Sequence, residues 1–148
     1  MRDVYVVAAA RTAIGRAIKG TLAQFRPEDM AAAAIDAAVK RAGIPAEKVQ
    51  DVVMGCVGQV GEQAINVARN AVLASKLPES VPATSVDRQC GSSQQALHFA
   101  AQAVMSGTMD VVIAAGVESM TRVPMGLSAA LPAQNGFGNY MSPRMKER

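Results

Sequence analysis

The sequence predicts a layered α/β fold with a mostly parallel sheet covered by helices. Apolar runs typical of strands alternate with segments of helical periodicity through residues 4–115. This alternation indicates parallel strands joined by crossover helices. The composition agrees, because half of the residues are hydrophobic while only 3% are aromatic. Small side chains of this kind let helices and a sheet pack closely.

Four short segments are predicted to be strands. The first, Val4–Ala10, is an uninterrupted apolar run, as expected of a strand that is buried on both faces. The other three are residues 51–57, 83–86 and 110–115.

Three segments between these strands are predicted to be helices. The first follows Pro27 and two acidic residues, Glu28 and Asp29, which suit the first turn of a helix, and it ends at Gly43. The second helix is expected over residues 66–75 and the third over residues 90–105, before Gly107. A glycine-bounded loop, residues 15–20, precedes the first helix.

The chain changes character after Gly116. Residues 117–148 contain three glycines, three prolines and four methionines, with no clear period. This composition predicts a loop-rich excursion or the start of a second unit. Residues 144–148 are expected to be helical, with no stop signal.

Charge and cysteine content exclude several classes of protein. The net charge of +3 is spread along the chain and is not interleaved with aromatic residues, which excludes nucleic-acid binding. Two distant cysteines and a single histidine, His98, form neither a disulfide framework nor a zinc site. The sequence shows neither a secretory signal nor an apolar stretch of transmembrane length, so no membrane partner and a reducing, cytoplasmic location are expected.

The segment Asp87–Ala96 is the most informative for chemistry. It places Cys90 between a short strand and an amphipathic helix, on the first helical turn. The free backbone N–H groups there favour a thiolate, and Gly91 and two serines leave room for a substrate carbonyl. The same N–H groups could stabilise an oxyanion. Alternatively, Cys90 is a buried small apolar residue. Both interpretations stay open on the residue types alone.

The same segment resembles the nucleophile motif of thiolases, in which Cys-Gly-Ser follows Asn/Asp-Arg-x at a strand–helix junction. Four further segments are similar to landmarks of that family and follow in family order: residues 9–15, 54–57, 61–69 and 116–121. Together they cover nearly the whole chain up to Met125. The resemblance favours Cys90 as the nucleophile.

The resemblance implies an acyltransferase of fatty acid metabolism and β-oxidation. A Cys90 thiolate would attack acetyl-CoA or a 3-oxoacyl-CoA, and a second thiol or an acetyl-CoA carbanion would take the acyl group, so degradation and synthesis are two directions of one reaction. Coenzyme A thioesters would be substrates, with no bound cofactor or metal. The resemblance further implies a layered α/β/α domain with a mixed sheet over residues 1–118, the start of a loop domain over 119–148, and a homodimer or homotetramer.

Three catalytic groups of thiolases have no counterpart in this sequence. They are a His in Gly-His-Pro, an Asn in Asn-Glu-Ala-Phe and a second Cys in Cys-x-Gly-Gly, all from a C-terminal half. His98 is expected to flank its helix, and Cys56 to be a buried structural thiol. The C-terminal half is therefore expected to be missing from this chain, which alone should not complete the cycle.

Predictions also follow for two charged residues and for the tail. Glu118 is expected to bond nearby backbone rather than to catalyse, and Arg69 either braces the turn around Cys90 or belongs to an exposed polar face. The methionine-rich tail either contacts a partner segment, which we favour, or lines an acyl pocket. Two rival functions remain: a related condensing enzyme acting on carrier-bound acyl chains, and a non-catalytic acyl-CoA or lipid-binding or assembly subunit.

Overall fold

The computed structural model describes residues 2–148 and contains three strands and five α-helices, with three short 3-10 helices (η). In chain order these are η1 Thr21–Gln24, α1 Pro27–Ala42, η2 Ala46–Lys48, β1 Asp51–Gly55, η3 Gly61–Gln63, α2 Val67–Ala74, β2 Ala83–Val86, α3 Ser92–Met105, β3 Val112–Gly116, α4 Leu127–Gln134 and α5 Pro143–Lys146.

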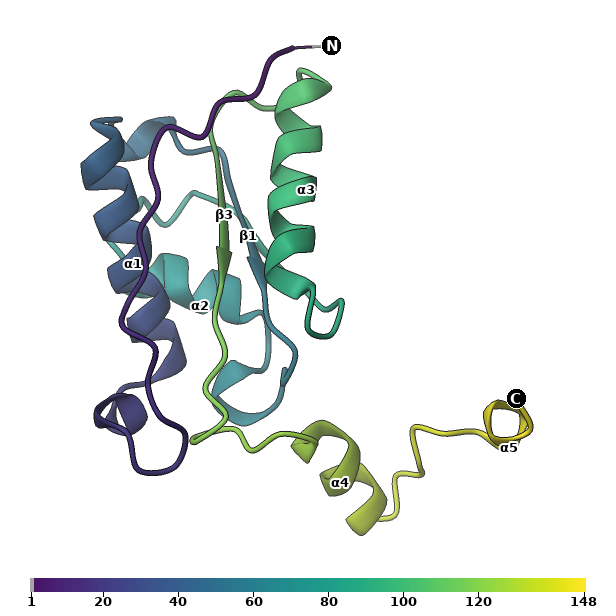
Figure 1. The fold of residues 1–148 in the computed structure, drawn as a ribbon. Helices are drawn as coiled ribbons and strands as arrows, with labels where there is room; N and C mark the ends of the chain where they lie inside the picture. The colour runs from purple at the N-terminus through teal and green to yellow at the C-terminus, as the bar shows by residue number, and fades with distance from the viewer. Residues whose placement is uncertain (1) are drawn as a thin grey trace.

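The three strands form one parallel sheet in the order β2-β1-β3. In the central strand, Val53 lies opposite Thr84 of β2 and Ala114 of β3. Helix α3 covers one face of the sheet, and α1 and α2 cover the other (Figure 1). The predicted layered α/β fold is therefore confirmed, and all three strands end at the same edge.

Local signals set the limits of α1. Pro27 occupies the first turn with Glu28 and Asp29, where acidic side chains face the positive end of the helix dipole. Gly43 ends the helix with a φ of 65°, and its N–H donates to the carbonyl of Lys40. The helix runs over the predicted residues because each of these signals is local.

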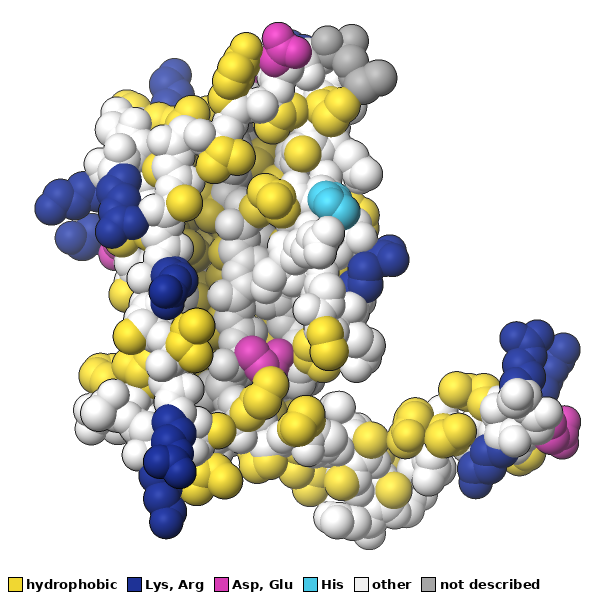
Figure 2. All heavy atoms as spheres, in the orientation of Figure 1, with side chains coloured by type: hydrophobic (Ala, Val, Ile, Leu, Met, Phe, Trp, Pro, Cys, Tyr) yellow, Lys and Arg dark blue, Asp and Glu magenta, His cyan; other side chains and the backbone are white. Residues whose placement is uncertain are grey.

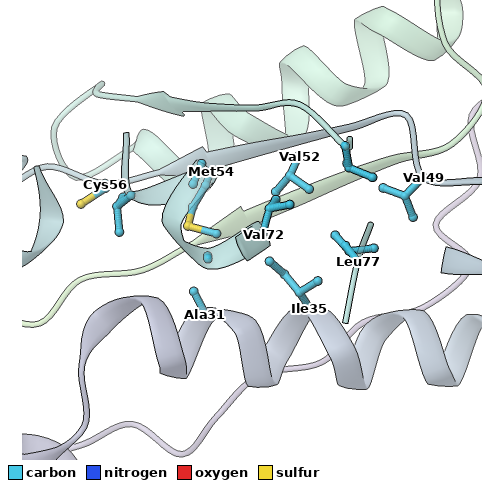
Figure 3. Packing of buried hydrophobic residues seen from close by; sticks show 12 residues of the cluster. Ala31, Ile35, Val49, Val52, Met54, Cys56, Val72 and Leu77 are labelled. Atoms are coloured by element: carbon cyan, nitrogen blue, oxygen red, sulfur yellow. The ribbon is translucent and has the colours of Figure 1, made fainter. Parts of the chain in front are cut away.

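The main core lies between the sheet and the pair of helices α1 and α2. Val52 and Met54 of β1 are fully buried and pack with Ile35 of α1 and Val72 of α2 (Figure 3). On the opposite face, α3 buries only small side chains such as Ala96. Small residues there let the axis of α3 approach the sheet closely.

The prediction of a strand over Val4–Ala10 is wrong. The segment has no regular secondary structure, and Tyr5, Val6 and Val7 are 77%, 76% and 65% exposed. Its ends are held by side chains instead: Arg2 pairs with Asp110, and Arg41 donates to the carbonyl of Ala9 at 2.6 Å. An apolar run is compatible with a strand only where a neighbouring strand accepts its backbone hydrogen bonds.

A groove separates this segment from β3. Its volume is about 1010 Å³, and its walls are the N-terminal segment, the outer edge of β3 and the flanking faces of α1 and α3. Hydrophobic side chains lie along this face of the molecule (Figure 2). Because the groove stands between the N-terminal segment and β3, the two cannot pair in this structure.

Amide hydrogen exchange distinguishes the two apolar runs. We expect amides of residues 4–10 to exchange at nearly the rate of an unfolded chain, because few are hydrogen-bonded, whereas those of Val52–Met54 should exchange only on global opening. The measurement is exchange followed by mass spectrometry. Equal protection of both segments would show that residues 4–10 pair with a strand in solution.

The tail is more helical than the sequence predicts. Helix α4 forms within the expected loop region although Pro132 lies inside it, and the chain then leaves the layered body before α5 (Figure 1). Its apolar side chains show little period, and an internal proline usually ends a helix, so the sequence pattern does not reveal α4. Within residues 2–148, no helix combines the length and apolarity needed to cross a bilayer.

Candidate active site

Cys90 lies in the turn between β2 and α3, with its side chain exposed. The turn is tight: the N–H of Gly91 donates to the carbonyl of Arg88 at 3.1 Å, and the N–H of Ser92 donates to that of Gln89 at 3.0 Å. Gln89 adopts a φ of 47°, a left-handed conformation that strains a residue with a Cβ. Helix α3 begins at Ser92, two residues later than predicted.

Two side chains fix the shape of this turn. The buried hydroxyl of Ser92 donates to the carbonyl of Gln89 at 2.6 Å and accepts the N–H of Arg88 at 2.9 Å. The carboxylate of Asp87 accepts the N–H of Gln89 at 2.7 Å. The sequence indicates only that Ser92 is small. In the structure, the hydrogen bonds of its hydroxyl hold Gln89 in the strained conformation.

The first turn of α3 rests directly on the ends of β1 and β3. A Cβ added to Gly55 would lie 2.3 Å from the carbonyl carbon of Ser92 and from the N of Ser93, and one added to Gly116 would lie 1.8 Å from the Oγ of Ser93. No side chain fits at either position. These two glycines therefore form the seat of α3, meaning the surface on which Ser92 and Ser93 rest, and they set the position of Cys90.

This arrangement suits nucleophilic chemistry. The first N–H groups of a helix have no carbonyl partner within the helix and carry its partial positive charge. Cys90 precedes those groups and is open to solvent, so a thioester could reach its Sγ. The N–H groups at such a helix start can stabilise an oxyanion that forms beside the sulfur.

Cys56 lies in a contrasting environment. It is 1% exposed in the core beside β1, and burial, together with the negative charges of Glu118 and Asp87, raises the pKa of its thiol to about 12. The thiol therefore stays neutral at physiological pH. The prediction that Cys56 is a buried structural thiol is confirmed.

The structure settles the positions of three other predicted residues. Glu118 accepts the backbone N–H of Val57 at 2.8 Å and that of Gly58 at 3.2 Å, which confirms the expected bonds to nearby backbone. Arg69 does not brace the turn around Cys90; it donates to the carbonyls of Glu79 and Val81 before β2. His98 is exposed on α3, as expected of a flanking residue.

Alkylation should separate the two cysteines. Between pH 7 and pH 9 we expect iodoacetamide to modify Cys90 of the folded protein and to leave Cys56 unmodified, because the raised pKa of Cys56 keeps it a neutral, buried thiol up to about pH 12. In denaturant both cysteines should react. Peptide mass spectrometry gives the two yields, and equal modification in the native state would contradict this assignment.

Comparison with known proteins agrees with this geometry. The family described as "Thiolase, N-terminal domain" matches residues 4–143. A steroid 3-ketoacyl-CoA thiolase of Mycobacterium tuberculosis is 47% identical over 137 residues, which are 93% of this chain and 33% of that protein. The 3-ketoacyl-CoA thiolases of Pectobacterium carotovorum and Bacillus subtilis are 47% and 42% identical, each over 84% of this chain and about a third of their own length.

The chain thus spans about a third of the length of these curated relatives. The family match covers the strands, the helices between them and the turn that carries Cys90. The resemblance inferred from the sequence motifs is confirmed: this chain belongs to the thiolase family and corresponds to its N-terminal part.

Proposed function

We propose that the protein containing this chain is an acyltransferase that cleaves or forms 3-oxoacyl-CoA thioesters through an acyl group carried on Cys90. One observation supports this most strongly. Within a chain of the thiolase family, the exposed cysteine is the one at the tight β2–α3 turn, while the other is buried with a raised pKa. A nucleophile needs the first environment and is inactive in the second.

In the degradative direction, the Cys90 thiolate attacks the 3-oxo carbon of the substrate. A C–S bond forms, the bond between the α and β carbons breaks, and the electron pair stays on acetyl-CoA, which takes up a proton. The thiol of a coenzyme A molecule then attacks the acyl thioester, gives up its proton and releases Cys90. The synthetic direction reverses these steps, beginning with acetyl transfer from acetyl-CoA to Cys90.

The rest of the catalytic machinery is proposed to come from the remainder of the full-length protein. Family resemblance implies three further catalytic groups, a His, an Asn and a second Cys that acts as a base, none of which has a counterpart in this sequence. We propose that residues 1–118 are the α/β domain and that residues 119–148 begin a loop domain. Family resemblance also suggests a homodimer or homotetramer.

Two substrate classes follow from the names of the relatives. One is a steroid 3-ketoacyl-CoA thiolase and the others are 3-ketoacyl-CoA thiolases. We therefore propose a coenzyme A thioester as the shared feature of the substrate, with a linear or a steroid-derived acyl group.

Steady-state kinetics of the full-length protein test the proposal. With a linear 3-oxoacyl-CoA and coenzyme A, acetyl-CoA should form, and double-reciprocal plots at several coenzyme A concentrations should be parallel, because an acyl-enzyme separates the two half-reactions. A steroid-side-chain 3-oxoacyl-CoA is the second substrate to compare. Binding of acyl-CoA without turnover of either substrate would instead support the non-catalytic role.

A further inference from the structure

Two loops at the carboxyl edge of the sheet are tied together by side chains. One loop follows β1 and contains Val57, Gly58 and Gln63, and the other follows β3 and contains Glu118 and Ser119. We call the hydrogen bonds among these five residues the clasp. Its members on the two loops are 55 to 61 positions apart in sequence.

Gln63 is the centre of the clasp. Its side chain is fully buried, yet it satisfies three hydrogen bonds. Its Nε2 donates to the carboxylate of Glu118 and to the carbonyl of Gly58, both at 2.8 Å, and its Oε1 accepts the N–H of Ser119 at 2.7 Å. A buried amide with all of these partners specifies one arrangement of the two loops, because any shift leaves polar atoms unpaired.

Glu118 completes the clasp with both of its oxygens. One oxygen accepts the N–H of Val57, and the other accepts the N–H of Gly58 and the amide of Gln63. Every partner is a donor. An amide at position 118 would turn an N–H group toward one of these donors, so even the isosteric change to Gln breaks the pattern.

A second link lies beside the clasp. Glu62, next to Gln63, binds Arg122 through both carboxylate oxygens, and the hydrogen bond from Arg122 lowers the pKa of Glu62. The two loops are thus joined at adjacent positions.

Gly58 leaves the space that the clasp needs, since a Cβ there would lie 3.0 Å from Glu118 and 3.3 Å from Gln63.

The clasp acts on the same strand ends that seat α3. Val57 is two residues beyond Gly55, and Glu118 is two residues beyond Gly116. The first turn of α3 rests on both glycines. The spacing of the two strand ends therefore sets where Ser92 and Ser93 lie, and with them Cys90.

We propose that Glu118 and Gln63 are positioning residues for Cys90, acting through the spacing of β1 and β3 beneath the first turn of α3. The inference rests on the proposed function in that it takes Cys90 to be the reacting group. Neither residue needs to touch the substrate in this role. A displacement of about 1 Å in a reacting group can cost about 100-fold in rate, which sets the size of the expected effect.

The test uses Glu118→Gln in the full-length protein, with Gly58→Ala as a second variant that crowds Glu118 and Gln63. Asn66→Ala is the matched control: the Asn66 side chain caps α2 and bonds Ser85 and the carbonyl of Ala83, so its loss destabilises the fold away from the clasp. For each variant we would measure denaturant unfolding, the rate of Cys90 alkylation by iodoacetamide, kcat and KM.

We expect Glu118→Gln to lower kcat by about 10- to 100-fold with KM changed by less than about threefold, and Gly58→Ala to lower kcat in the same direction by less. Both variants should also slow the alkylation of Cys90, because they displace the turn that carries it. Asn66→Ala should lose stability with unchanged alkylation. Unchanged alkylation and kcat in both clasp variants would overturn the proposal.

The readouts separate this proposal from the proposed function. If the unmodified protein alkylates at Cys90 but turns over no acyl-CoA, acyl transfer is wrong. The alkylation rates of the variants then still support the clasp if they fall, and overturn it if they do not.

Discussion

Replacing Cys90 with alanine in the full-length protein is expected to lower kcat for acyl transfer by about 10³- to 10⁶-fold. The reaction as proposed passes through a covalent thioester, so no other side chain can substitute for the missing sulfur. Cys90 is exposed, and its side chain makes no contact in the core. The free energy of unfolding should therefore stay within about 0.5 kcal/mol of the unmodified protein.

The matched control for this variant is Cys56→Ala. Its sulfur lies in the core, so the substitution should cost about 1–3 kcal/mol of stability through lost packing while kcat is retained. Kinetics and chemical denaturation of the two variants give opposite patterns under the proposal. A Cys90→Ala protein that keeps its activity, or a Cys56→Ala protein that folds but loses it, would contradict the assignment of the nucleophile.

Adding one methyl group at Gly55 or Gly116 is expected to displace α3 and to lower the free energy of unfolding. At Gly55 the new Cβ would lie 2.3 Å from backbone atoms of Ser92 and Ser93, which cannot rotate away. Helix α3 must then move off the sheet. We expect Gly55→Ala to cost about 3 kcal/mol of stability, at the upper end for overpacking. Thermal or denaturant unfolding measures this loss.

Gly116→Ala provides a graded comparison, because its new Cβ would meet the Oγ of Ser93, which can rotate, and the Cβ of Ser93 at 2.8 Å, a smaller overlap than the 2.3 Å at Gly55. It should cost less stability than Gly55→Ala but should still slow kcat, since Cys90 lies two residues before Ser92. The control for stability is Gly91→Ala: its Cβ would meet the carbonyl of Arg88 at 3.5 Å, an ordinary contact, and its φ of −96° suits alanine. Equal stability of the three variants would show that the glycines do not seat α3.

Features set by neighbouring residues were predictable from the sequence. The limits of α1 follow from Pro27 and Gly43, and those of β2 from its place between Pro82 and Asp87. The strand–helix junction that carries Cys90 was predictable for the same reason. At this junction the start of α3 is displaced, because the turn at Gln89 takes up two residues that the pattern assigns to the helix.

Features that depend on distant residues were not predictable. The run Val4–Ala10 has the composition of a strand, but composition does not show whether a neighbouring edge is within reach, and here the groove stands between it and β3. The same limit applies to the clasp. The sequence predicts that Glu118 bonds nearby backbone. It does not show that Gln63, 55 residues away, is fully buried and bonds to Glu118.

The most direct test of the central claim is to look for the acyl group on Cys90 itself. The full-length protein would be mixed with acetyl-CoA, quenched in acid and digested, and the peptides carrying Cys90 and Cys56 would be analysed by mass spectrometry. The account predicts one acetyl group on the Cys90 peptide, removed again by added coenzyme A, and none on the Cys56 peptide. Acetylation at Cys56, or a Cys90 peptide that stays unmodified while the protein turns over substrate, would contradict it.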